Sequence, residues 1–178
     1  MDKNQALVFL TTHQPIRAEN ELRKIIRYFH EASYYFQCHP DPACVPVFLN
    51  CFGHYSNMGI YTTIENILLE VDRDIVLYHL NEALYSQCPA IRYWCARLAQ
   101  TFFSPQLIDG LIYVYEQGDL SSQCAALTAL SDIRHRKVEN FLEQALTRAT
   151  DTDLLVLLKF VYTQQAMEGS PLGKLAIN

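Results

Sequence analysis

The feature of the sequence that most constrains its fold is a weak internal repeat with a period of about 31 residues. The first half of each unit shares a set of apolar positions, in which Val76, Leu77, Leu80 and Leu84 correspond to Leu107, Ile108, Leu111 and Tyr115. The second half shares another set, in which Ile91, Cys95, Ala96 and Leu98 correspond to Leu120, Cys124, Ala125 and Leu127. Apolar residues spaced three and four apart line one face of an α-helix. Each unit is therefore predicted to be a pair of amphipathic helices.

The pattern extends in both directions and predicts helical hairpins at residues 42–70, 72–102, 104–132 and 134–167. The ends of these helices carry suitable capping residues. Asp41 and Ser104 each precede a proline, which is favoured at the first position of a helix. Gly118 is expected to end one helix in a left-handed conformation, and Asp119 to cap the next. No segment alternates apolar and polar residues as a half-buried strand would.

The N-terminal part of the chain is expected to form a capping element for the stack of hairpins. Residues from Pro15 to Gln37 are interpreted as one long helix with an apolar side. A stack of repeats exposes an apolar face at its end unless an atypical element covers it. The prediction is thus an all-α superhelix forming one domain over residues 1–178, with a cap helix at 14–38, repeats at 42–167 and a tail at 168–178.

The composition points to a cytoplasmic protein. The early apolar run from Ala6 to Leu10 is too short for the core of a signal peptide. The longest uncharged stretch, 42–64, is interrupted by prolines and glycines, which a membrane helix would avoid. The six cysteines include no CxxC pair, so a reducing compartment is expected. Cys95 and Cys124 are interpreted as small apolar side chains packed inside the protein.

The second helix of one hairpin carries a motif that resembles the HEAT repeats. In Ile91-Arg92-x-x-Cys95-Ala96-x-Leu98 it is similar to the VRxxAAxAL pattern of that family, and Cys124-Ala125-Ala126-Leu127 repeats its small-residue core. Ser121 stands where the motif's arginine would recur. The resemblance covers residues 42–167 and implies an α-helical repeat whose concave surface is lined by the second helices. HEAT-like proteins are typically scaffolds and binding modules.

The distribution of charge indicates the sign of a partner. Residues 57–133 contain three basic residues, Arg73, Arg92 and Arg97, against nine acidic ones. Such a surface repels nucleic acid and attracts a cationic protein, although an acidic balance also serves solubility. In its size, acidity and many tyrosines the chain resembles bacterial immunity proteins that neutralise nuclease toxins. This likeness implies a monomer that binds a cationic toxin domain and blocks its active site.

The second helices are expected to present the binding surface. If Ile91 and Cys95 face inward, then Tyr93, Arg97 and Gln100 face outward, and Tyr61 and Glu65 do the same in the preceding hairpin. Tyrosine and arginine dominate the energetics of protein interfaces. The alternative is an ordinary solvated face. We predict that the partner-binding residues are Tyr61, Glu65, Tyr93, Arg97 and Gln100.

The residues that resemble a metal site do not match a known zinc spacing. The strip consists of Cys38, His39, Cys44, Cys51 and His54. The separations between its cysteines, and from the last cysteine to the second histidine, are x5, x6 and x2, which no zinc motif uses. Packing of the cysteines in the core is therefore favoured, and neither a metal nor a cofactor is predicted.

Two further functions are weighed against protein binding. A HEAT-like DNA repair enzyme would need a broad basic surface, and the basic run is Arg17, Arg23, Lys24 and Arg27. Glutamates four residues away pair with part of this run, which favours a solvated helix face. For catalysis, the histidines are scattered, and the sequence contains no GxSxG, HExxH or phosphate-binding loop motif. We therefore predict a binding protein, with a general scaffold and a repair enzyme as the alternatives.

Overall fold

The computed structural model describes residues 1–16, 22–53 and 59–169, and all regular structure in these ranges is helical. The elements are α1 Lys3–Thr12, α2 Leu22–Cys38, α3 Cys44–Asn50, α4 Ile60–Leu69, α5 Arg73–Leu84, α6 Pro89–Leu98, the 3₁₀ helix η1 Pro105–Leu107, α7 Ile108–Gln117, α8 Leu120–Ser131, α9 Arg136–Arg148 and α10 Thr152–Gly169. The prediction of an all-α fold is confirmed for this part of the chain. None of the helices there has both the length and the hydropathy needed to cross a bilayer.

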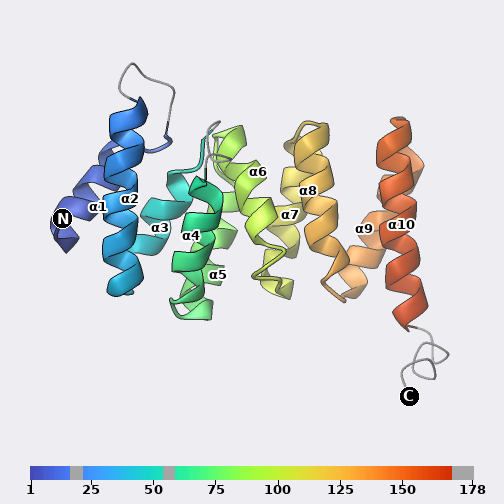
Figure 1. Ribbon diagram of the computed structural model, residues 1–178. Coiled ribbons are helices and arrows are strands. Elements are labelled where there is room, and N and C mark those ends of the chain that lie inside the picture. Colours follow the sequence, from blue (N-terminus) through green and yellow to red (C-terminus); the bar gives the residue numbers. More distant parts are fainter. Residues whose placement is uncertain (17–21, 54–58, 170–178) are drawn as a thin grey trace.

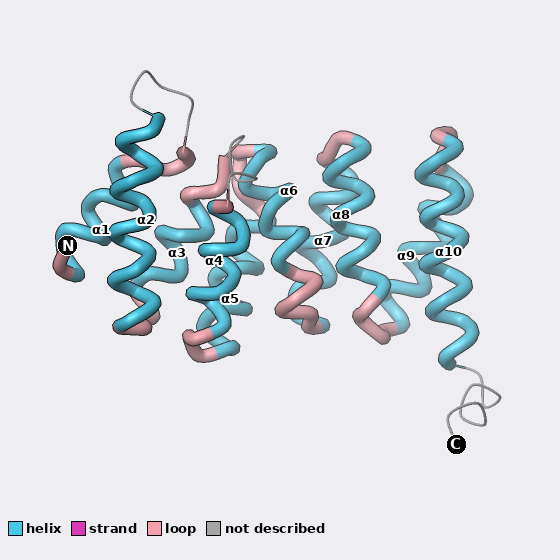
Figure 2. The backbone as a smooth tube through the Cα atoms, viewed as in Figure 1, coloured by secondary structure: helices cyan, strands magenta, loops and turns pink. Residues whose placement is uncertain are grey.

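The helices lie in two layers that run from the N-terminal to the C-terminal end of the molecule (Figure 1). The even-numbered helices stand side by side in front, and the odd-numbered helices lie behind them. Packing contacts join α6 to α8 and α8 to α10 in one layer, and α3 to α5 and α5 to α7 in the other. Consecutive helices, such as α7 with α8 and α9 with α10, also pack against each other. From α4 onward, turns and loops at the two edges connect consecutive helices (Figure 2).

Several helix boundaries follow from capping residues that the sequence identifies. The hydroxyl of Ser104 accepts a hydrogen bond from the backbone N–H of Gln106 at the start of η1. The carboxylate of Asp119 accepts one from the N–H of Ser122 at 2.9 Å and caps α8. These predicted starts are confirmed, because each satisfies N–H groups that have no partner inside the helix.

The prediction for Gly118 is wrong in its conformation. Its φ of −94° is not left-handed, and the chain leaves α7 in an extended form that leads directly into the cap of α8. Glycine is required at this position for a steric reason instead. An added Cβ atom would lie 2.5 Å from the Cβ of Ser122 and 2.5 Å from the carbonyl oxygen of Val114. Glycine therefore permits the close approach of the two helices rather than a special backbone angle.

The prediction of a single cap helix over residues 14–38 is also wrong. The described N-terminal region holds two helices, α1 and α2, which pack against each other. Helix α1 begins at a capping box formed by Asp2 and Gln5. Ile16 is buried, and its backbone N–H bonds to the carbonyl of Cys51 instead of a helical partner. Residues 17–21 and 170–178 lie outside the described residues, and α10 extends to Gly169, past the predicted start of the tail at 168.

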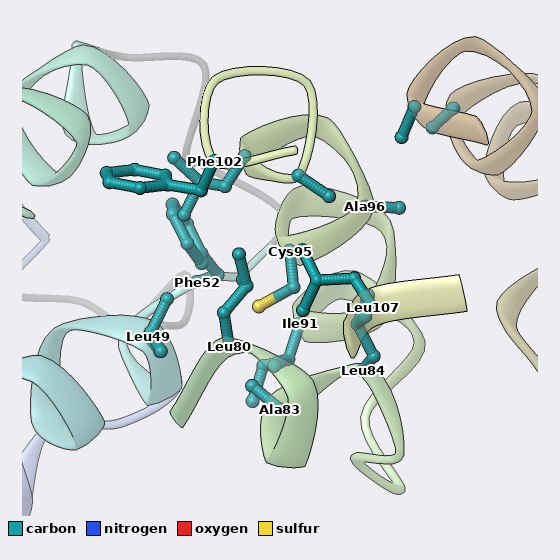
Figure 3. Packing of buried hydrophobic residues seen from close by; sticks show 14 of the residues in the cluster. Leu49, Phe52, Leu80, Ala83, Leu84, Ile91, Cys95, Ala96, Phe102 and Leu107 are labelled. Carbon is teal, nitrogen blue, oxygen red and sulfur yellow. The ribbon is translucent and has the colours of Figure 1, made fainter. Parts of the chain in front are cut away.

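Buried apolar side chains form one cluster that extends from α1 to α10. Figure 3 shows its middle part, where Leu80 and Leu84 of α5 meet Ile91 and Cys95 of α6. Leu107 of η1 packs against the same group. The apolar positions of the repeat lie mostly in this cluster, so the periodicity of the sequence describes the inward faces of the helices.

The buried side-chain amide of Gln165 connects α10 to α8. Gln165 of α10 is 3 % exposed, and its amide nitrogen lies within 3.0–3.3 Å of the carbonyl oxygens of Leu130, Ser131 and Ile133. These carbonyls lie at the C-terminal end of α8 and just beyond it, where helical partners are missing. The side chain thus satisfies backbone groups of a different helix.

Candidate protein-binding surface

An aromatic cluster joins the C-terminal end of α3 to helices α4 and α6. The rings of Phe52, Tyr61 and Trp94 are in mutual contact, with centroids 5.2–6.2 Å apart. The indole N–H of Trp94 donates a hydrogen bond to the carbonyl oxygen of Gly53 at 3.1 Å. Aromatic pairs at such distances add to the energy of simple burial. The cluster therefore holds α4 and α6 in a fixed relation and supports the side chains above it.

Arg97 lies on this cluster. Its guanidinium carbon is 5.5 Å from the ring centroid of Tyr61 and 5.7 Å from that of Trp94, within the range of cation–π attraction. A side-chain hydrogen bond to Tyr93, together with the nearby Glu65, raises the pKa of Arg97 against the opposing effect of partial burial. The side chain is exposed, so its charge is held in place by rings while it faces solvent.

Glu65 connects the same two helices. Its carboxylate oxygen accepts a hydrogen bond from the hydroxyl of Thr101 at 2.6 Å and another from the hydroxyl of Tyr61 at 3.4 Å. Burial, followed by the charge of Glu65, raises the pKa of Tyr61, so this phenol stays protonated. Both residues are half-buried, although the helical pattern places them on an outward face. Both are thus less exposed than Arg97, which they adjoin.

Two adjoining hollows lie between α6 and α8. The first, which we call the Arg97 hollow, has a volume of about 500 Å³. It is lined by Tyr93, Arg97, Gln100, Leu120, Ser121, Cys124, Ala125 and Thr128. The second, the N-terminal hollow, has a volume of about 280 Å³. It is lined by Gly53, Pro89, Ala90, Tyr93, Trp94, Asp119, Ser121 and Ser122. Tyr93 and Ser121 line both, so the hollows form one depression along the two helices.

The structure brings the five predicted residues into one region. Tyr61 and Glu65 come from α4, Tyr93 and Arg97 from α6, and Gln100 follows the end of α6. The first four contact one another, whereas Gln100 joins them only as a wall of the Arg97 hollow. Their role in binding remains a prediction, because proximity alone shows a surface and not a partner.

Sequence reasoning missed part of this surface. Trp94, which supports Arg97, is the only tryptophan in the chain and follows Tyr93 directly, so its presence was a usable signal. Thr101, which bonds to Glu65, gave no signal in the helical pattern. The α8 side of the depression includes Leu120, which is 43 % exposed. Leu120 was interpreted as a core position of the repeat, and only the packing of α8 beside α6 shows that it faces the hollow.

The metal-like strip separates into buried and exposed parts. Cys44 and Cys51 are buried, whereas Cys38 and His39 are exposed and His54 lies outside the described residues. Within the described ranges, no group of three or more His, Cys, Asp or Glu side chains is arranged to hold a metal ion. All six cysteines are free. Cys95 is buried as predicted, but Cys124 is only half-buried and lines the Arg97 hollow.

Only part of the predicted basic run lies among the described residues. Arg17 and Glu19 lie outside these residues, and so does the expected pair of Glu19 with Arg23. The other, between Arg27 and Glu31, is present with its nitrogen and oxygen atoms 3.7 Å apart. Both side chains are exposed, and such pairs contribute little to stability. This part of α2 fits a solvated helix face.

Comparison with known proteins places no further constraint on the function. No protein-family model, no curated protein and no solved structure matches the chain.

Proposed function

We propose that this chain is a HEAT-like helical-repeat protein that binds another protein, and that it acts as an immunity protein that neutralises a cationic nuclease toxin. The observation that carries the binding proposal is the fixed Arg97 on the ring cluster, beside a depression lined by Tyr93 and Leu120. A half-buried tyrosine and an exposed arginine next to a partly apolar hollow are typical of interface centres. Because the arginine is already positioned, less side-chain entropy is lost on binding.

The arrangement of the helices supports a repeat architecture of the HEAT type. Consecutive helices from α3 to α10 pack as pairs, and contacts within each layer join α3 to α5, α5 to α7 and α7 to α9, and α6 to α8 and α8 to α10. The depression lies between α6 and α8, which are the second helices of two successive pairs. In the HEAT-like proteins that the sequence resembles, second helices line the binding surface. The position of the depression fits that resemblance.

The net charge of segment 57–133 supports a cationic partner. The two other basic residues of segment 57–133 are engaged with the protein's own backbone. Arg73 donates to the carbonyl of Phe103 at 2.7 Å, and Arg92 donates to the carbonyl of Ser86 at 2.8 Å. Against them stand nine acidic side chains. A net negative field of this kind accelerates association with a positively charged protein, and the anchors of the depression then occlude the toxin's active site.

The test is a binding measurement with the purified protein encoded by the reading frame next to this gene, which the proposal expects to contain a nuclease domain. We expect nanomolar affinity, an association rate that falls as salt rises, and loss of nuclease activity in the complex. Replacing Tyr93 and Arg97 together by alanine should weaken binding by about thirty-fold or more, mainly through faster dissociation, as for interface hot spots.

The matched control is Tyr78→Ala on α5, in the opposite layer. Tyr78 is 63 % exposed and lies outside the depression, so its removal should leave affinity unchanged. Equal losses for the control and the double variant would mean that another face binds the partner. Retention of duplex DNA by the free protein at physiological salt would contradict the inhibitor and favour a repair enzyme. Affinity for an assembly of other proteins, without nuclease inhibition, would favour a scaffold.

A further inference from the structure

We propose that the Arg97 hollow receives an acidic side chain of the partner, flanked by an apolar residue. This proposal rests on the proposed function, because it assigns a chemistry to the contact that the binding protein makes. Arg97 is the only charged residue among the described side chains that line this hollow. The hollow therefore has a local charge opposite in sign to the net charge of segment 57–133, to which all its lining residues belong.

The guanidinium of Arg97 has donors available for a ligand. Its contacts are two ring faces and the side chain of Tyr93, and no carboxylate of the described residues forms an ion pair with it. The nearby carboxylate of Glu65 accepts hydrogen bonds from Thr101 and Tyr61. A guanidinium has five N–H groups in a planar fork that matches a carboxylate. The hydrogen bond to Tyr93 leaves part of this fork open.

The other residues that line the Arg97 hollow indicate which kind of residue lies beside the partner's carboxylate. Leu120, Cys124 and Ala125 of α8 give an apolar side opposite Arg97, and Leu120 is 43 % exposed. Gln100 and Thr128 add neutral polar groups at the same hollow. A volume of about 500 Å³ accommodates a few side chains. The fitting ligand is thus a short protein segment in which an aspartate or glutamate neighbours a leucine-like residue.

A cationic partner is consistent with this local contact. Net charge governs the approach of two proteins over a distance of about a Debye length, roughly 8 Å at physiological salt. The short-range contact depends on the individual groups that meet. In a nuclease, the carboxylates that hold catalytic metal ions would be suitable groups, because they lie in the cationic cleft that an inhibitor must block.

The experiment uses the full chain and defined peptides, so it does not require the partner. The probes are Ac-Ala-Leu-Asp-Leu-Ala-NH₂ and the same peptide with Asn or Lys in place of Asp. Binding is followed by NMR through the indole N–H of Trp94 and the guanidinium N–H of Arg97. The chain has a single tryptophan, so the indole signal reports this cluster alone. We expect the Asp peptide to bind at least about tenfold more tightly than the Asn peptide, and the Lys peptide not to bind.

Three variants make the result specific. Arg97→Gln should remove the preference for Asp over Asn, and Arg97→Lys should keep only part of it because lysine lacks the planar fork. Arg136→Gln, at an exposed position on α9, should keep the full preference. Circular dichroism checks that each variant is folded. Equal binding of the Asp and Asn peptides, absence of binding by all three, or a preference that survives Arg97→Gln would overturn the proposal.

The result is separate from the test of the proposed function. If the nuclease binds and is inhibited but the peptides show no preference for Asp, the toxin proposal stands and the carboxylate contact is wrong. If the peptides bind as expected but the nuclease does not, the contact stands and the partner is a different protein.

Discussion

The six cysteines illustrate at the residue scale how burial determines the chemistry of a side chain. Burial raises the pKa of Cys51 to about 12, and of Cys44 to about 12, because a thiolate would lose its hydration there. Cys95 is fully buried and its pKa is raised for the same reason. Cys38, at the end of α2, is exposed. The thiolate is the reactive form, so identical residues differ in reactivity by position alone.

We predict that Cys38 of the folded protein reacts with iodoacetamide at pH 7.5 well before Cys44, Cys51 and Cys95. The modified residues are identified by mass spectrometry at successive times, with a sample unfolded in guanidinium as the control in which all six react. Early labelling of any of the three buried cysteines in the folded sample would show that its thiol is accessible, contrary to the structure.

The residues of the candidate surface were predictable to different extents. Tyr93 and Arg97 follow from helical periodicity alone, because they lie on the side of α6 opposite Ile91 and Cys95. Periodicity does not show that Glu65 bonds to Thr101, since those residues belong to different hairpins. Contacts of this kind depend on how neighbouring helices stack. The sequence therefore indicated which face of α6 is outward, but not which neighbours complete the surface.

At the scale of the helices, most helices after residue 42 were predictable and those of the N-terminal region were not. The hairpins carry apolar positions at regular spacing and capping residues at their boundaries. In the N-terminal region, helix α1 has a weak amphipathic pattern with only Ala6 and Leu10 buried, and its capping box at Asp2 was the one clear signal. The backbone bond from Ile16 to Cys51 links residues distant in sequence, and local periodicity cannot predict it.

Asp119 provides a pH-dependent test of a helix cap. Hydrogen bonds from the backbone and then the hydroxyl of Ser122 hold the pKa of Asp119 below its usual value, so its charged form stabilises the fold. This contribution is present above the unfolded pKa of about 3.9 and is lost as the pH falls through the lower folded value. We expect Asp119→Ala to reduce the free energy of unfolding by about 1 kcal/mol at pH 7, and by less at pH 3.

Urea unfolding followed by circular dichroism at both pH values measures this difference. Asp119→Asn is the matched control, because asparagine caps a helix about as well but does not titrate. The Asp119→Asn variant should be nearly as stable as the natural chain at pH 7, and its capping contribution to the free energy of unfolding should not decrease at pH 3. If Asp119→Ala lowered the free energy of unfolding equally at pH 7 and pH 3, the carboxylate charge would contribute nothing to the cap.

At the scale of the whole molecule, stability should vary along the row of helices. Helices α5, α7 and α8 have packed neighbours on both sides in their layers, and α6 packs against α8 and meets α4 through the rings of Tyr61 and Trp94. Helices α1 and α10 lie at the two ends of the row (Figure 1). Each end helix therefore has one unpacked side within its layer. In molecules built of stacked units, each unit is stabilised chiefly by its neighbours.

We therefore expect amide hydrogen exchange to be slowest in α5 to α8 and faster in α1 and α10. Mass spectrometry of peptic fragments after deuterium labelling measures this order, with the fully unfolded chain as the reference for complete exchange. The same protection for all helices would mean that the chain opens only as a whole, and that the ends of the row are no weaker than its middle.

The amide of Gln165 fixes the way in which the last helix docks on α8. Its nitrogen lies 3.0–3.3 Å from the carbonyl oxygens of Leu130, Ser131 and Ile133, at the end of α8 and just beyond it. Truncation of the chain before residue 165 would remove these contacts and leave the carbonyl of Ser131 to water. This side chain therefore limits how far α10 can be shortened before it detaches from α8.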